Sequence, residues 1–232
     1  MFTRFLVALQ LLTIFSGRKK IEIDSTMWVQ SATYFPIVGL TLGTGAWIMS
    51  MLLEPLLSPL LRDVTAMSVL ALTGRTFLGV KRIDRLVSTS LCMSNRILLH
   101  GTLLVLKIYA LHSLHGGYRD AGLLLAPMLG RWAWVVLAYS SRIGPDQDWT
   151  TLLIKQIQFN EFALASLIAL GILFTLTSIV GIALVIPLGG LIIVSTLRWN
   201  TRKNGVTGKD FQMLGESVET AALLLLSLVG AG

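Results

Sequence analysis

The sequence predicts an all-α fold: a polytopic bundle of about seven transmembrane helices, preceded by a short N-terminal re-entrant or interfacial helix. Hydrophobic residues make up 54% of the 232 residues and charged residues only 13%, and the mean hydropathy is +0.75. These values are far from those of a soluble domain. Long apolar runs alternate with short polar segments, and no linker-like stretch divides the chain. Residues 1–232 are therefore expected to form a single domain.

The first apolar stretch, FTRFLVALQLLTIF at residues 2–15, is too short to cross roughly 30 Å of hydrocarbon. It suits a helix that reaches partway into the bilayer or lies on its surface. A signal peptide is disfavoured because Arg18, Lys19 and Lys20 follow the apolar part, whereas a signal carries its positive charge before it. The expected spans are 34–53, 64–80, 97–114, 121–140, 162–180, 181–197 and 217–231. Gly181 and the segment 187–190 are expected near the turn between the fifth and sixth spans.

The basic residues predict the orientation of these spans. Of the nineteen Lys and Arg residues, fourteen fall in segments on one side of the predicted bundle, and only Arg62 and Arg119 fall on the other. Loops retained in the cytoplasm carry the Lys/Arg excess. The pattern therefore predicts that the N-terminus is inside and the C-terminus outside, and we expect the protein in a prokaryotic inner (cytoplasmic) membrane. Because the cations follow membrane sidedness and form no platform with aromatic residues, nucleic acid is not expected as a partner.

Three cations, Arg75, Lys107 and Arg131, fall within or at the edge of expected spans, whereas no carboxylate is expected at mid-span. A charged group at a helix centre in hydrocarbon costs roughly 2.5–3.5 kcal/mol even on the lowest scale, so such groups usually face a partner or a wet cavity. Arg75 is close enough to a span end to extend to the interface instead. Arg131 lies beside Trp132 and Trp134, which could form an aromatic belt, but its mid-span position favours an inward-facing role.

Several local patterns occur in a characteristic order along the chain. They are Leu11–Phe15 (LLTIF), Ser31–Gly39 (SATYFPIVG), Ala126–Arg131 (APMLGR), and Gly205–Gly208 (GVTG) followed by two glutamates. Over almost its whole length the chain thus resembles the integral-membrane cobalamin synthases, also named adenosylcobinamide-GDP ribazoletransferases. The resemblance implies an enzyme that joins the activated lower part of the corrin to alpha-ribazole or its phosphate.

The departures from this family are concentrated where the resemblance places the chemistry. Thr73 and Gly74 keep the start of the family's T-G-G-x-H-L-D-G-L-A-D-x-x-D-G block, but Asp84 is the only acid near it. Arg96 keeps the arginine of a D-S-R-I segment, whose acid is lost. The residues that stand at the family's histidine and aspartate positions are Phe77, Gly79, Ile83, Leu86, Ser94 and Lys209.

The resemblance and the residue chemistry together give two sets of candidate site residues. The candidates for binding phosphate or another ligand are Arg75, Arg96, Lys107 and Arg131. If the chain is active, the candidates for holding Mg²⁺ are Asp84, Asp210, Glu216 and Glu219. Glu216 and Glu219 are three residues apart and share a helix face. They could equally be solvated residues at a helix start, where the helix dipole favours acids.

The basic surface formed by Arg75, Lys81, Arg82 and Arg85 would repel a metal ion and attract phosphate. It is also what a cytoplasmic loop obeying the charge rule would contain. The single Cys92 allows no internal disulfide and no Cys-based metal site. The G-x-x-x-G pattern of Gly39 and Gly43 predicts close helix contact, mainly within the chain.

Two functions remain open at this point. In the favoured hypothesis the chain is a non-catalytic subunit of a membrane complex, with a structural or ligand-holding role. It would pack against a membrane-protein partner or a second copy within the lipid bilayer, and a tetrapyrrole-like or lipid ligand would suit a retained cavity. In the alternative, it is an active Mg²⁺-dependent adenosylcobinamide-GDP ribazoletransferase that makes cobalamin or its 5'-phosphate.

Overall fold

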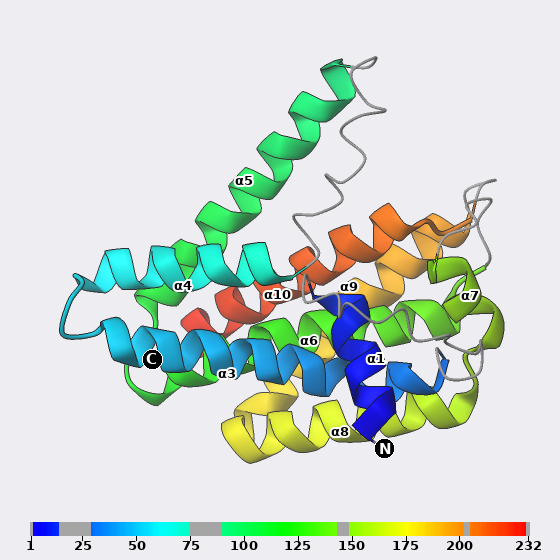
Figure 1. The fold of residues 1–232 in the computed structure, drawn as a ribbon, viewed down its shortest axis with the longest axis horizontal. Helices are drawn as coiled ribbons and strands as arrows, with labels where there is room; N and C mark the ends of the chain where they lie inside the picture. Colours follow the sequence, from blue (N-terminus) through cyan, green and yellow to red (C-terminus); the bar gives the residue numbers. More distant parts are fainter. Residues whose placement is uncertain (1, 14–28, 75–89, 143–148, 202–204, 231–232) are drawn as a thin grey trace.

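The computed structural model describes residues 2–13, 29–74, 90–142, 149–201 and 205–230, and these are helical with short connections (Figure 1). Seven helices overlap the seven expected spans, of which residues 75–80 and 231 lie outside the described residues. They are α3 (Phe35–Leu53), α4 (Pro59–Thr73), α5 (Ser90–Ser113), α6 (Gly117–Ser140), α8 (Phe159–Thr177), α9 (Val180–Asn200) and α10 (Gly208–Gly230). Shorter helices are α1 (Phe2–Leu12), the 3-10 helix η1 (Ser31–Tyr34) and α7 (Trp149–Gln156). The all-α prediction is confirmed for the described residues.

Five of the helical segments are both long and apolar enough to cross a membrane: 31–53, 117–140, 159–177, 180–200 and 208–230. Helix α4 has 15 residues and is shorter than these five, whereas α5 has 24 residues, of which the described apolar part is 98–113. The expected count of seven spans is thus approximate, although each expected span corresponds to a helix. The N-terminal stretch is helical as expected, and its residues Val7, Ala8 and Leu12 are fully buried.

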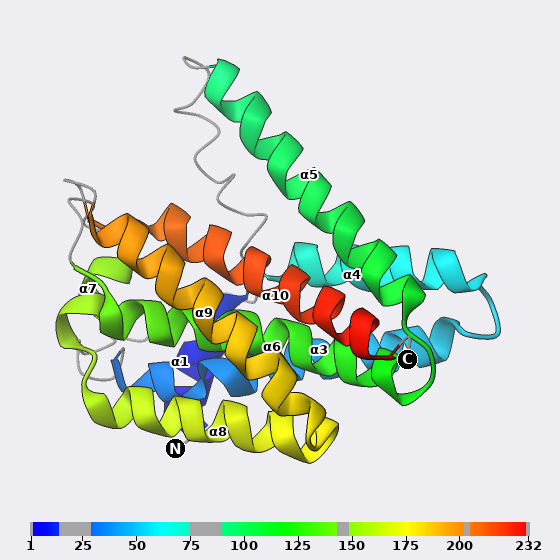
Figure 2. The same cartoon turned by 180° about the vertical axis from the view of Figure 1, so that it is seen from behind.

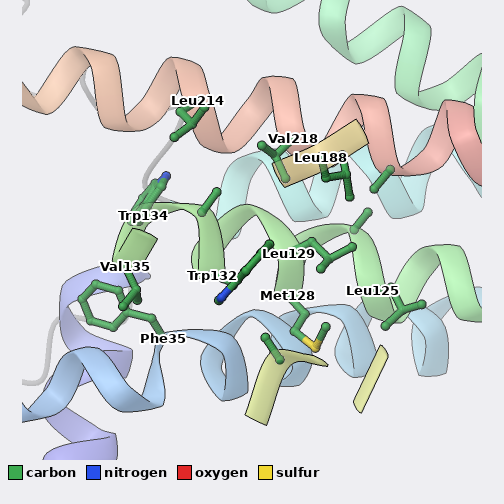
Figure 3. Close-up of a cluster of buried hydrophobic side chains, with 14 of the residues drawn as sticks. Phe35, Leu125, Met128, Leu129, Trp132, Trp134, Val135, Leu188, Leu214 and Val218 are labelled. Carbon is green, nitrogen blue, oxygen red and sulfur yellow. The ribbon is translucent and has the colours of Figure 1, made fainter. Parts of the chain in front are cut away.

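Helix α6 is the central element of the bundle. Within its most apolar 18-residue window 89% of the residues are buried, against 17% for α8 and 28% for α9. Its neighbours with the most extensive contacts are α3 and α10. Figure 3 shows Phe35 of α3 on one side of α6, and Leu214 and Val218 of α10 on the other. Helices α6 and α10 therefore share the best-packed part of the core.

Close contact between α3 and α6 depends on two glycines. A Cβ atom built on Gly39 would lie 2.4 Å from the carbonyl oxygen of Pro127, and one on Gly43 would lie 2.6 Å from that of Leu123. Small residues of this kind let helix backbones approach in membrane proteins. The G-x-x-x-G pattern thus packs within the chain, as predicted. Gly45 has open space around its Cβ position.

Several helix boundaries differ from the predicted spans, and the start of α10 and the turn between α8 and α9 are two of them. Helix α10 begins at Gly208, nine residues before the predicted span, because Thr207 and Asp210 cap its first turn. The turn between α8 and α9 lies at Ser178, whose φ is +50°, and Pro187 is inside α9 and not in the turn. A proline is tolerated within a membrane helix where neighbouring groups satisfy the freed carbonyl.

Helix α5 runs obliquely to the others. Figures 1 and 2 both show its N-terminal half diverging from the bundle, while its C-terminal half lies against α4 and α10. Leu98 in the diverging half is exposed, and so are Val105 and Tyr109, which lie on the side of the packed half away from the core. The packed half of α5 carries Lys107, so the crossing of α5 with α10 brings this cation into the core.

Candidate functional site

Two acidic residues of α10 face the interior of the bundle. Glu216 and Glu219 are three residues apart, which places their side chains on one face of the helix. Each residue is only 8% exposed. The predicted span of 217–231 put the two glutamates at its entrance, whereas α10 begins at Gly208, so both lie well inside the helix. They are buried among helices and do not project from a solvated helix start.

Lys107 of α5 and Arg131 of α6 neutralise these carboxylates. The Lys107 ammonium donates to Glu219 Oε2 at 2.6 Å and also to Glu216 Oε2. The Arg131 guanidinium donates through Nη1 to Glu219 Oε1. Lys107 is 6% exposed and Arg131 is 2% exposed. We call these four residues from three helices the central charge cluster.

Small residues make room for the central charge cluster. A Cβ atom on Gly130 would lie 2.6 Å from Glu219 Cγ, so a glycine lets the glutamate lie flat against α6. One on Gly215 would lie 2.5 Å from Trp134 Nε1. The Arg131 Cζ atom lies 5.5 Å from the centre of the Trp134 ring, a cation–π distance. Trp134 therefore packs against Arg131 in the core and is not part of an aromatic belt at the membrane surface.

The central charge cluster is electrically balanced, with two cations and two carboxylates. Isolated charges would be very costly in this setting, whereas charges that are paired and hydrogen-bonded are tolerated. The adjoining cavity has a volume of about 20 Å³, room for about one water molecule. Arg131 Nε is buried without a hydrogen-bond acceptor in the described structure. A water or a single ligand oxygen in the cavity could accept this N–H.

Asp210 has a different role from the two glutamates. The backbone N–H and the hydroxyl of Thr207 both donate to Asp210 Oδ2, at 2.9 and 2.8 Å. Asp210 is six residues before Glu216, so helix geometry separates them by about 9 Å along the axis and turns their side chains to different faces. Asp210 thus caps α10 and is not in the group formed by the glutamates.

The other predicted site residues fall where the structure gives less information. Arg75 and Asp84 lie outside the described residues. Arg96 is in α5, but its side chain is also outside the described part. In the portion of the chain that the structure does describe, no group of three or more His, Cys, Asp or Glu side chains gathers to hold a metal. The structure therefore brings together four of the eight candidates: Lys107, Arg131, Glu216 and Glu219.

A second buried ion cluster was not foreseen from the sequence. Asp63 of α4 is 2% exposed and accepts hydrogen bonds from Arg119 of α6 through Nε at 3.2 Å and Nη2 at 2.5 Å. His112 Nδ1 lies 3.0 Å from the other Asp63 oxygen, and Arg119 also donates to Ser50 at 2.9 Å. The available signal was that Arg119 is one of only two basic residues predicted at that end of the bundle, where a buried cation needs a counterion.

The chain is similar to one protein family over most of its length. A family model described as "Cobalamin-5-phosphate synthase" matches residues 4–78 and 97–229. The protein named adenosylcobinamide-GDP ribazoletransferase from Desulforamulus reducens is 28% identical over 98% of this chain and 97% of its own length. Proteins of the same name from Thermoanaerobacter pseudethanolicus and Alkaliphilus metalliredigens are 23% and 26% identical over at least 95% of each chain. No solved structure gives a significant match.

Proposed function

The chain belongs to the cobalamin-5-phosphate synthase family, and we propose that it keeps the family's fold without its magnesium-dependent transfer chemistry. In this proposal it is a non-catalytic structural subunit of a complex in the membrane. The observation that carries the proposal is that the carboxylates of Glu216 and Glu219 are already paired with cations of the protein. Glu216 is bound by Lys107, and Glu219 is bound by both Lys107 and Arg131.

The described residues do not fit a magnesium site in this arrangement. Mg²⁺ takes near-octahedral oxygen ligands and usually keeps several waters, held by one or two carboxylates and by substrate phosphates. Here the Lys107 ammonium contacts both glutamates, so a divalent ion bridging them would first have to displace it. The adjoining space of about 20 Å³ holds about one water molecule, fewer than a hydrated magnesium ion carries.

The sequence comparison supports the same proposal from another direction. The family model is interrupted between residues 79 and 96. This interval contains Gly79, Ile83 and Leu86, which stand where the resemblance implies aspartates. The interruption therefore coincides with the block in which the acidic residues are lost. A chain selected for helix packing alone could lose these acids while retaining the buried ion pairs that its core requires.

The second candidate function is an active adenosylcobinamide-GDP ribazoletransferase. The observation in its favour is that relatives with this name align over nearly the whole chain at 23–28% identity. In that case Glu216 and Glu219 would exchange Lys107 for a metal ion when substrate binds. Asp84, which is outside the described residues, would be the nearest additional acid in the sequence block.

An activity assay separates the two candidates. The purified full-length protein in mild detergent would be incubated with adenosylcobinamide-GDP and alpha-ribazole, with and without Mg²⁺. The Desulforamulus reducens relative, prepared in the same way, is the positive control. The proposal predicts no product from this chain and a stoichiometric protein partner when the chain is purified from its native membrane. Mg²⁺-dependent product that disappears in a Glu219→Gln variant would refute the proposal.

A restoration experiment tests the stated cause of inactivity. Aspartates would be introduced together at the three positions where the resemblance implies them, as Gly79→Asp, Ile83→Asp and Leu86→Asp. If their loss removed the metal chemistry, the triple variant should bind Mg²⁺ more tightly than the native chain by isothermal titration. Unchanged Mg²⁺ binding would mean that the lost acids do not explain the proposed loss of function.

A further inference from the structure

A second cavity lies away from the central charge cluster. Its volume is about 240 Å³, and it opens where α3 ends and where α4 and α6 begin. Trp47 and Glu54 line it near the end of α3, Arg62 lines it from α4, and Arg119 and Asp120 line it from α6. We call it the Arg62–Arg119 pocket. It contains the two cations that the sequence places on the side of the bundle with few basic residues.

Two hydrogen-bond donors of this pocket have no acceptor. The indole Nε1 of Trp47 and the Nε of Arg62 are both buried and make no hydrogen bond in the described structure. Buried N–H groups are nearly always paired with protein, water or ligand. Trp47 and Arg62 come from different helices and line the same cavity, so one ligand carrying two acceptor oxygens could satisfy both. Phosphate oxygens are the natural partners of such a donor pair.

The pocket also holds its second guanidinium in a fixed position. Arg119 donates to the buried Asp63 through two nitrogens and to Ser50 through one of them. Arg62 is fixed less firmly, by a 3.1 Å ion pair with Glu54, whose side chain is 67% exposed. The positive wall of the pocket is therefore organised before any ligand arrives, which lowers the entropic cost of binding.

The charge of the pocket selects the class of ligand. The two guanidinium groups are accompanied by the carboxylates of Glu54, Asp63 and Asp120. Within the described part of the chain no ion pair reaches Asp120. A simple anion would meet more negative than positive charge here. A zwitterion that brings both a phosphate and an ammonium group would match the donors and leave the ammonium for Asp120.

The surroundings of the pocket indicate that this zwitterion belongs to a lipid. Met51 is 52% exposed, and exposed leucines continue around the α3–α4 connection beside it. Apolar side chains at this position would contact acyl chains while a headgroup occupies the polar cavity. A tryptophan with one polar edge is also typical of the interfacial region of a bilayer. The apolar rim and the polar pocket therefore suit the two parts of one molecule.

We propose that the Arg62–Arg119 pocket binds the headgroup of a zwitterionic phospholipid of the phosphoethanolamine type. The phosphate accepts the N–H groups of Trp47 and Arg62, and the ammonium group donates to Asp120. The site is independent of the proposed function, because Arg119 and Arg131 are twelve residues apart on α6, about 18 Å along its axis. A lipid at this place would tie the ends of α3, α4 and α6 together.

The test is lipid binding by the full-length protein in detergent, measured by native mass spectrometry. Phosphatidylethanolamine, phosphatidylcholine, phosphatidylglycerol and inorganic phosphate would be titrated separately. Phosphatidylethanolamine should bind at least about fivefold more tightly than phosphatidylcholine, the factor expected for one hydrogen bond that a trimethylammonium group cannot donate. Equal binding of all three lipids would overturn the proposal. Binding of inorganic phosphate that competes fully with the lipid would overturn the assignment to a lipid.

Two substitutions test which protein groups bind the lipid headgroup. Trp47→Phe removes one N–H and should weaken all phospholipids by about fivefold. Asp120→Asn should abolish the preference for phosphatidylethanolamine over phosphatidylcholine and leave phosphatidylcholine binding unchanged. The matched control is Trp132→Phe, which removes an indole N–H bonded to Ser166 elsewhere in the bundle and should not change lipid binding. If Asp120→Asn, folded as judged by its melting temperature, keeps the native preference, the proposal is wrong.

Discussion

Replacing Lys107 with methionine should strongly destabilise the bundle. In the native protein Lys107 and Arg131 together balance Glu216 and Glu219, and all four residues are at most 8% exposed. Lys107→Met preserves most of the side-chain volume but leaves one uncompensated negative charge in the core. Removing one partner of a buried ion pair typically costs about 3–5 kcal/mol. We expect a loss of free energy of unfolding of about 3 kcal/mol, a change of more than a hundredfold in the equilibrium constant.

A double-mutant cycle separates charge balance from packing. Glu216→Gln alone leaves the cluster with one excess positive charge, whereas Lys107→Met combined with Glu216→Gln restores balance through the Arg131–Glu219 pair. The double variant should therefore be within about 1 kcal/mol of the native protein, because replacing a buried ion pair by neutral groups is often close to neutral. The coupling between the two substitutions should therefore be at least about 2 kcal/mol, and larger by whatever Glu216→Gln alone costs.

The assay is reversible unfolding in mixed micelles of mild detergent and sodium dodecyl sulfate, followed by tryptophan fluorescence. Trp132 and Trp134 on α6 report on the helix that carries Arg131. The control is Lys155→Met, the same change at an exposed position of α7, which should alter stability by less than about 0.5 kcal/mol. The reasoning fails if Lys107→Met costs less than about 1 kcal/mol, or if the double variant is as unstable as the single one.

Two further predictions concern helix packing and capping, and both use the same unfolding assay. Gly39→Ala places a methyl group 2.4 Å from the carbonyl oxygen of Pro127, so it should destabilise the protein by about 1–3 kcal/mol. Gly45→Ala has open space and should be neutral or slightly stabilising; a similar loss for both variants would contradict the proposed close contact. Asp210→Ala removes the acceptor of Thr207 and should cost about 0.5–2 kcal/mol. An unchanged stability of this variant would show that the cap is not needed to start α10.

Much of the fold could be predicted from the sequence because membrane helices must be long, apolar and internally hydrogen-bonded. Each expected span corresponds to a helix, and the glycines at 39 and 43 pack within the chain as predicted. Helix ends were less predictable. The early start of α10 depends on a local cap at Thr207 and Asp210, and the turn at Ser178 depends on a backbone conformation that no glycine marks.

The sequence predicted individual residues of the candidate site but not which of them contact one another. The cost of an ionisable group in hydrocarbon indicated that Lys107 and Arg131 face inward, and both are buried. Their partners were assigned instead to a metal ion, because the sequence does not show that α5 and α6 meet the same face of α10. The buried Asp63 was missed for the same reason, since its partners His112 and Arg119 come from two other helices, α5 and α6.

The sequence by itself determined that this protein is a helical membrane protein of the cobalamin-5-phosphate synthase family, because composition, apolar periodicity and ordered motifs are properties of the chain alone. The tertiary structure decided which charges meet. It joined Lys107 and Arg131 to Glu216 and Glu219, and it gathered Arg62, Trp47 and Asp120 around one pocket. Coulomb energies and hydrogen bonds depend on distances of a few ångströms between distant segments, and only the packing of the helices sets those distances.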